Sequence, residues 1–187
     1  MVFGWRSAVL LLQIIPLMIV AVLLWTRSRE TRASYFLIGL MAAWALLITP
    51  YVIGFMGAYD LYPWLTFAPF NTEVWFGGLV YLYALTLTQY GLPARWWLWL
   101  VPGAVQTSYY TLCFVLLGSG ERKFAFNNAF HEPFIVPLET IASVGLAIAG
   151  VILSWRQVSR YRAWLSATHA GKERFDLTSL RVFLVIT

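Results

Sequence analysis

The chain has 187 residues, of which 60% are hydrophobic and only 11% charged. A soluble domain is nearer a quarter charged, and a chain of this length cannot bury such a surplus of apolar side chains. The composition therefore excludes an ordinary soluble domain and predicts one surrounded by lipid. The single cysteine, Cys113, also excludes a disulfide framework or a cysteine-based metal site within the chain.

Five apolar segments are long enough to cross the hydrocarbon core, which takes about 20 helical residues. They lie at about 8–26, 35–54, 72–90, 96–117 and 134–155. Helices are required because lipid offers no partner for free backbone groups. A sixth apolar segment, 177–187, covers about half a bilayer. We expect an all-α polytopic bundle, one transmembrane domain over 1–187 with five full spans and a partial sixth, and we expect the natural chain to continue.

The distribution of Lys and Arg between the loops predicts the orientation of this bundle. The loops after spans one, three and five hold Arg27, Arg29, Arg32, Arg95, Arg156, Arg160, Arg162, Lys172 and Arg174. The opposite side holds only Arg6, Arg122 and Lys123. Cytoplasmic loops carry the excess of positive charge, so the N-terminus is expected outside and the protein in the inner membrane as a multi-pass protein.

The segment 156–168 is expected to continue the fifth helix beyond the membrane for two or more turns. It alternates aromatic residues with the membrane-surface candidates Arg156, Arg160 and Arg162. Such a pattern is typical of a helix on an anionic leaflet, although anchoring by positive charge alone explains the same arginines. Gly171 is expected to end the helix, since glycine is common just past a helix end.

Polar and ionisable side chains gather in the outer half of the predicted bundle. Ionisable residues inside spans are costly and usually face the bundle interior or a cavity, which makes Glu139 in span five the leading ligand-binding candidate. We expect its side chain to face Glu73 of span three, or Gln106 and Tyr110 of span four. The alternative is a carboxyl near the interface, bonded to a Tyr or Gln neighbour. The ligand-binding candidates are Glu139, Glu73, Gln106, Tyr110, Tyr109, Trp75 and His131.

These candidates suit a cationic or hydroxylated ligand, or a pH-sensitive contact, because two close carboxylates share a proton. The sequence contains no Gly-rich phosphate loop, no His pair at i, i+4 and no nucleophile elbow. His131 and His169 fall on opposite sides of the predicted membrane and cannot share a metal. We therefore expect no enzyme activity, cofactor or metal. A catalytic site built from Glu73, His131 and Glu139 is the weaker alternative.

Two segments are similar to a family of bacterial seven-helix membrane domains. The segment 70–83, which carries Tyr81-Leu82-Tyr83 after Gly77-Gly78, resembles the family's third helix, commonly a small or proline residue followed by Leu-Leu-Tyr-Leu-Tyr. The segments 159–165 and 175–181 resemble the connection between helices five and six. These domains precede the output domains of membrane-bound transcriptional regulators, mostly of the AraC type, with related LytTR-type or histidine kinase outputs.

The resemblance implies a membrane sensory domain, here ending within helix six, that senses an external or membrane-borne ligand and relays to a cytoplasmic output. It implies a homodimer or a larger membrane complex. The expected partners are the lipid bilayer and a small ligand of unknown identity, with no direct nucleic-acid contact from this segment. The alternative is a small transporter or an accessory membrane subunit, which the sequence leaves open.

Overall fold

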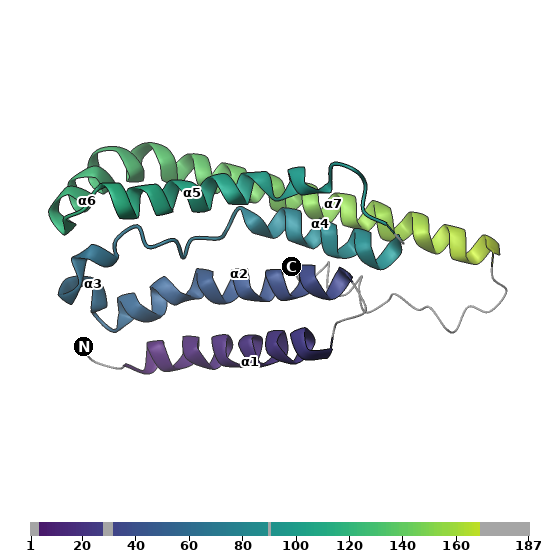
Figure 1. Ribbon diagram of the computed structural model, residues 1–187, viewed down its shortest axis with the longest axis horizontal. Helices are drawn as coiled ribbons and strands as arrows, with labels where there is room; N and C mark the ends of the chain where they lie inside the picture. Colours follow the sequence, from purple (N-terminus) through teal and green to yellow (C-terminus); the bar gives the residue numbers. More distant parts are fainter. Residues whose placement is uncertain (1–3, 28–31, 90, 169–187) are drawn as a thin grey trace.

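The structure is a computed structural model that describes residues 4–27, 32–89 and 91–168, and these form helices and connecting segments with no strand. Figure 1 shows the helices lying side by side as an elongated bundle. The expected all-α fold is confirmed. In chain order the elements are α1 (Trp5–Arg27), α2 (Arg32–Phe55), α3 (Ala58–Leu61), η1 (Pro63–Leu65), α4 (Trp75–Thr88), η2 (Trp96–Trp99), α5 (Val101–Leu116), α6 (Gly120–Phe126), η3 (Asn127–Ile135) and α7 (Val136–Thr168).

Three helical stretches are long and apolar enough to cross a membrane: α1, α2 and the stretch from α6 to Leu165. This supports a membrane protein by length and composition. The predicted span at 96–117 forms η2 followed by α5, a 3-10 turn and then an α-helix of 16 residues. The partial sixth span at 177–187 and the helix end predicted at Gly171 lie outside the described residues.

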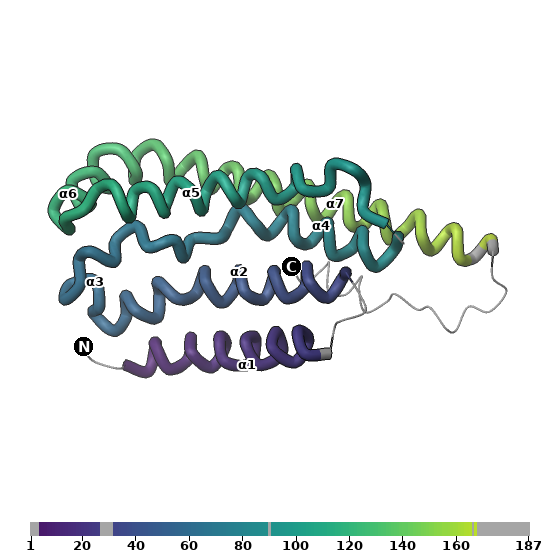
Figure 2. The backbone as a smooth tube through the Cα atoms, viewed as in Figure 1, coloured from purple at the N-terminus to yellow at the C-terminus, as the bar shows by residue number. Residues whose placement is uncertain are grey.

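The predicted span at 72–90 is wrong in its bounds, because α4 begins at Trp75 and has only 14 residues. The chain before it, 66–74, is not helical and runs from the end of the bundle at α3 back to the middle, where α4 begins (Figures 1 and 2). Pro69 cannot donate a backbone hydrogen bond and disfavours helix at the residue before it. Proline therefore keeps a helix from extending back through position 68, although it does not set the start of α4 at Trp75.

The non-helical segment is tied into the protein interior. Phe67, Thr72 and Val74 are buried, and the Thr72 hydroxyl donates to the carbonyl of Ala43 in α2 at 2.6 Å. Irregular backbone at membrane depth is tolerated only where protein or a water-filled cavity surrounds it. The bundle around this segment supplies that protein surrounding.

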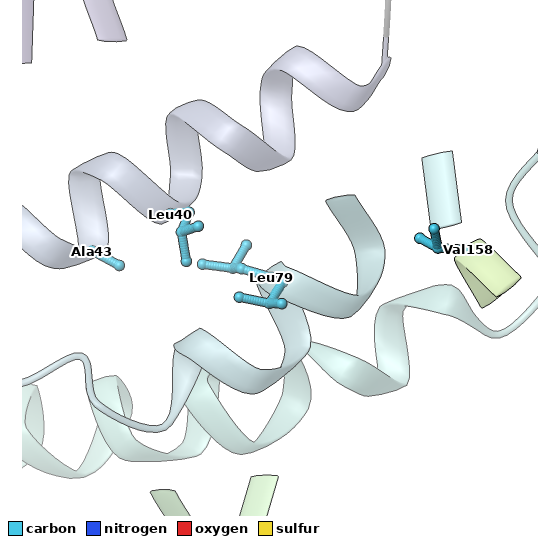
Figure 3. Close-up of a cluster of buried hydrophobic side chains, with 5 residues drawn as sticks. Leu40, Ala43, Leu79 and Val158 are labelled. Carbon is cyan, nitrogen blue, oxygen red and sulfur yellow. The ribbon is translucent and has the colours of Figure 1, made fainter. Parts of the chain in front are cut away.

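The short helix α4 is the centre of the bundle, packing on α2 on one side and α7 on the other. Its crossing with α7 is made by glycine: a Cβ on Gly77 would meet the backbone carbonyl of Leu146, and one on Gly150 would meet that of Gly77. Small residues allow such close approach of membrane helices. Figure 3 shows the neighbouring apolar core, with Leu40 of α2, Leu79 of α4 and Val158 of α7.

The helix α7 is the longest element, with 33 residues. It runs past the ends of its neighbours in Figure 1. It remains helical through 156–168, so the predicted extension of this helix beyond position 155 is confirmed. At about 1.5 Å per residue the helix is about 50 Å long, well above the roughly 30 Å of a hydrocarbon core.

Candidate functional site

Polar side chains from three segments converge beside the start of α7. Asn71 comes from the non-helical segment, Tyr110 from α5 and Glu139 from the first turn of α7. Tyr110 is at the centre, because its hydroxyl lies 3.0 Å from Asn71 Nδ2 and 2.9 Å from Glu139 Oε2. The predicted orientation of Glu139 toward the bundle and Tyr110 is confirmed.

The direction of the hydrogen bond between Asn71 and Tyr110 can be assigned. The backbone N–H of Glu73 donates to Asn71 Oδ1 at 3.4 Å, which identifies the other end of that amide as the NH₂ group. Asn71 Nδ2 therefore donates to the Tyr110 oxygen, and also to Glu139 Oε2 at 3.4 Å. The Tyr110 hydrogen remains for Glu139 or for a third neighbour, because a phenol has one hydrogen and accepts two.

That third neighbour is His131, which η3 holds with only 5% of its surface exposed. Its Nε2 lies 3.3 Å from the Tyr110 hydroxyl, and its Nδ1 lies 3.0 Å from the Tyr109 hydroxyl. A neutral imidazole donates from one nitrogen and accepts at the other. The two tyrosines, the histidine and the carboxyl are thus joined in one unbroken series of hydrogen bonds.

The π-helix η3 matters for this geometry. Its backbone hydrogen bonds join residues five positions apart, so its turns are wider than those of an α-helix. Such turns often occur at functional sites. Pro133 lies inside it and removes one backbone donor. This wider winding separates α6 from α7 and carries His131 between the two tyrosines of α5.

An aromatic side chain covers the imidazole. The ring of Phe67 lies 4.9 Å from that of His131 in an edge-to-face arrangement, and it also contacts the rings of Tyr110 and Phe126. Phe67 has φ of 65°, a left-handed conformation that is rare for a bulky residue. Such strain costs on the order of 1–3 kcal/mol and clusters at functional sites.

Gln106 places an unpaired donor beside this series of hydrogen bonds. Its side chain is 4% exposed, and its Oε1 accepts the backbone N–H of Val74 at 3.2 Å, which fixes the orientation of the amide. Its Nε2 adjoins the Glu139 carboxyl, but no acceptor lies within hydrogen-bonding geometry. An unsatisfied buried donor costs about 1–3 kcal/mol, so this NH₂ group favours an additional acceptor.

Besides Gln106, two predicted site residues lie apart from this series of hydrogen bonds. The Trp75 indole donates to Thr107 at 3.0 Å and packs against Gly103, which joins α4 to α5. The Glu73 carboxyl forms no hydrogen bond with Glu139, although its negative charge acts on the Glu139 carboxyl. Both residues therefore surround the cluster without completing it, and the cluster consists of Asn71, Tyr109, Tyr110, His131 and Glu139.

Sequence reasoning missed two residues of this region. Asn71 was not among the candidates, although a side-chain amide next to the start of an apolar run was a usable signal. Lys123 was counted as an ordinary loop charge, yet it is only 1% exposed. Its Nζ donates to the Trp64 carbonyl at 2.6 Å and lies 4.0 Å from the centre of the Phe114 ring, a cation–π contact.

The chemistry of this cluster is hydrogen-bond donation and acceptance. In the described part of the chain, no three His, Cys, Asp or Glu side chains come together as a metal site. No protein-family model matches the chain, and no curated protein or solved structure matches it.

Proposed function

We propose that the chain is the multi-pass membrane sensory domain of a bacterial signalling or transcription-regulating protein, located in the inner membrane with its N-terminus outside. The observation that carries the proposal is that α7 connects the polar cluster to the far end of the bundle. Glu139 lies in the first turn of α7, and the same helix continues unbroken to Thr168. That distance is about 44 Å at the usual helical rise.

A sensor needs a coupling element as well as a binding site. The inner half of α7 packs through Gly150 against α4, and Val158 of α7 is fully buried in the core cluster. Such packing resists bending, so a change at Glu139 moves the helix as a unit. A ligand shifts the helix only if it contacts the two states of the cluster differently.

The resemblance of segments 70–83 and 159–165 to bacterial seven-helix sensor domains supports the same function. On that basis the signal passes to a cytoplasmic output, and Arg156, Arg160 and Arg162 contact the anionic headgroups of the inner leaflet. The ligand comes from outside the cell or from the membrane. A dimer is the expected assembly.

The orientation is tested by cysteine accessibility in whole cells. Single cysteines are introduced at Ser28 and Ser119 in a background with Cys113→Ala. A membrane-impermeant thiol reagent is expected to label position 119 in intact cells and position 28 only after the membrane is opened. The reverse pattern contradicts the orientation.

The sensory role is tested in the native gene. Glu139→Gln keeps the size and hydrogen-bonding capacity of the side chain and removes its charge. The expected result is an altered transcript profile at unchanged protein level, measured by RNA sequencing. Glu121→Gln is the matched control, because Glu121 is exposed, lies in the first turn of α6 and is not among the residues of the cluster. Equal profiles for wild type and both variants contradict the proposal.

A small transporter is the second candidate, and the interruption before α4 favours it. Transporters often place substrate at a helix that is broken near the bilayer midplane. Here the non-helical segment 66–74 precedes a 14-residue half-helix and carries Asn71 into the cluster. Solute uptake into proteoliposomes that depends on Glu139, with no change in transcripts, selects this function instead.

A further inference from the structure

The series of hydrogen bonds from Tyr109 to Glu139 has the connectivity of a proton relay. It passes from the Tyr109 hydroxyl to His131 Nδ1 over 3.0 Å, from His131 Nε2 to the Tyr110 hydroxyl over 3.3 Å, and on to Glu139 Oε2 over 2.9 Å. We infer that this cluster is a proton-binding site, which takes a proton at Tyr109 and delivers one to Glu139. The inference rests on the proposed sensory function and names the proton as its ligand.

With Glu139 ionised, the hydrogens have only one consistent arrangement. Tyr110 donates to Glu139, and its two lone pairs accept from Asn71 Nδ2 and from His131 Nε2–H. His131 Nδ1 is then bare and accepts the hydrogen of Tyr109. Every donor and acceptor along the relay is satisfied in this state.

With Glu139 protonated, the same atoms allow the opposite direction. Glu139 donates its new hydrogen to Tyr110, Tyr110 donates to His131 Nε2, and the imidazole donates from Nδ1 to the Tyr109 oxygen. Asn71 remains a donor to Tyr110, because the backbone N–H of Glu73 holds its amide in place. Every bond of the relay is again made, and only the Tyr109 hydrogen turns to a partner outside the relay. The two states therefore differ by one proton and one histidine tautomer.

The proton transfer from Tyr109 to Glu139 balances in atoms and in charge. A proton from water binds the Tyr109 oxygen, and the hydrogen already on Tyr109 moves to His131 Nδ1. The hydrogen on Nε2 moves to Tyr110, and the hydrogen of Tyr110 moves to Glu139. One proton has entered and one carboxylate has been neutralised, with no other group changed in charge. Tyr109 and Glu139, at the two ends of the relay, are half-buried, whereas Tyr110 and His131 between them are buried. In the inferred relay Tyr109 is the entry, because Glu139 is the group that the proton neutralises.

The surroundings favour a proton over a larger cation. The acidic charge of Glu73 acts on Glu139, that of Glu132 acts on His131, and Cys113 adjoins Tyr109. Among the described residues no Lys or Arg pairs with Glu139. The Phe67 ring covers the imidazole, and a proton needs no added space.

Gln106 makes the two states mechanically different. Its unpaired Nε2 adjoins the Glu139 carboxyl, and an ionised carboxylate attracts this donor more strongly than a neutral acid does. Proton uptake therefore weakens the attraction between α5, which carries Gln106, and α7, which carries Glu139. That is the state-dependent contact a sensor requires.

The relay is tested by following the tautomer of His131 directly. The full chain carrying His169→Asn is labelled with ¹⁵N-histidine, reconstituted in lipid nanodiscs and titrated with acid. Nitrogen NMR is expected to show the Nε2–H tautomer at high pH and the Nδ1–H tautomer at low pH. Infrared spectra are expected to show a carboxylic acid band that grows in step and is absent in Glu139→Gln.

Two variants decide whether the groups are linked. In Glu139→Gln the tautomer is expected to stay fixed over the same pH range. In Tyr110→Phe the carboxyl and the imidazole are expected to titrate separately, and thermal unfolding of both variants shows whether they are folded. A tautomer that still switches in Glu139→Gln, a tautomer that never switches in the wild-type chain, or an imidazolium formed in its place overturns the relay.

The failure of the relay is distinct from the failure of the sensor. If the His131 tautomer stays fixed in the wild-type chain and Glu139→Gln alters the transcripts, the proton is not the ligand. That result supports a sensor for another ligand. A switching tautomer with unchanged transcripts supports the relay and contradicts the sensory function.

Discussion

The two halves of α7 are held by different kinds of interaction. Its first turn is held by directional hydrogen bonds, in which Glu139 Oε2 accepts from Tyr110 and Asn71. Further along, α7 is held mainly by close packing, in which Gly150 lies against the backbone of Gly77 and Val158 is fully buried. Hydrogen bonds can be rearranged by one proton, whereas a glycine crossing allows a single close fit.

This difference assigns a separate role to each half. In the proposed relay, the half of α7 that carries Glu139 has two satisfied arrangements of the same side chains, whereas the half that carries Gly150 has one. On that proposal, a change of state at the polar cluster is carried along α7 and is not absorbed by the packing with α4. The comparison can be tested by perturbing each half separately and ranking the effects.

The largest effect is expected at the glycine crossing. In Gly77→Leu the new Cβ meets the backbone of Leu146, which cannot move aside as a flexible side chain does. The expected loss is about 3 kcal/mol of stability or more, since overpacking a close contact is costly. Gly145→Leu is the control, because nothing lies within 4 Å of a Cβ there. Equal thermal unfolding of the two variants in nanodiscs would contradict the rigid inner half.

The next largest effect is expected at buried Lys123. Lys123→Met keeps a long side chain but leaves the Trp64 carbonyl without its donor and removes the cation over Phe114. Losing a hydrogen bond from a charged group is expected to cost about 2 kcal/mol. Arg122→Met, at an exposed neighbour, should change stability by less than about 0.5 kcal/mol. Chemical or thermal unfolding of both variants in the same micelles measures the difference.

A smaller loss of stability is expected when the Tyr110 hydroxyl, at the centre of the cluster, is removed. Tyr110→Phe leaves Asn71, His131 and Glu139 without a shared partner, at an expected cost of about 1–2 kcal/mol. Tyr109→Phe removes the bond to His131 and the contact of the hydroxyl with Cys113, and it should cost about half as much. Unfolding curves for the pair give the ranking. A larger loss in Tyr109→Phe would place the centre of the cluster elsewhere.

The smallest effect on stability is expected when Phe67 and Phe126 are each replaced by alanine and by glycine, because the two positions should favour opposite replacements. At Phe67, φ of 65° favours glycine, so Phe67→Gly should be more stable than Phe67→Ala by about 1 kcal/mol. At Phe126, which ends the helix α6, glycine should be the worse replacement by a few tenths of a kcal/mol or more. Paired unfolding measurements at both positions test this. The same order at both positions would remove the strain assigned to Phe67.

The sequence predicted α7 and its site residue well. The apolar run and the arginines after it indicated one helix continuing past position 155, and α7 runs to Thr168. The cost of a carboxyl facing lipid predicted that Glu139 faces the bundle, and its oxygen accepts from Tyr110. Both successes depend on properties of single helices, which periodicity and charge describe directly.

The sequence failed where the tertiary path of the chain decides the structure. Hydropathy averages over a window and indicated one span at 72–90. In the structure, the Thr72 hydroxyl and the Val74 backbone N–H bond to other segments, and α4 begins only at Trp75. Asn71 and Tyr110 are 39 positions apart, and their contact depends on that half-helix beginning in the middle of the bundle. The charge of Lys123 indicated a solvated loop, whereas rings and a carbonyl of other segments surround it.

The length of α4 also has a consequence for biogenesis. At about 1.5 Å per residue its 14 residues extend about 21 Å, too short to cross the hydrocarbon core unaided. Its glycine face has no side chains to contact lipid and closes against Trp99 at Gly78 and against α7 at Gly77, and both partners are synthesised later. In the proposed membrane arrangement, the first two helices are each long and apolar enough to insert unaided. Insertion of α4 would then wait for the segments that follow it, and the order of assembly would differ from the order of synthesis.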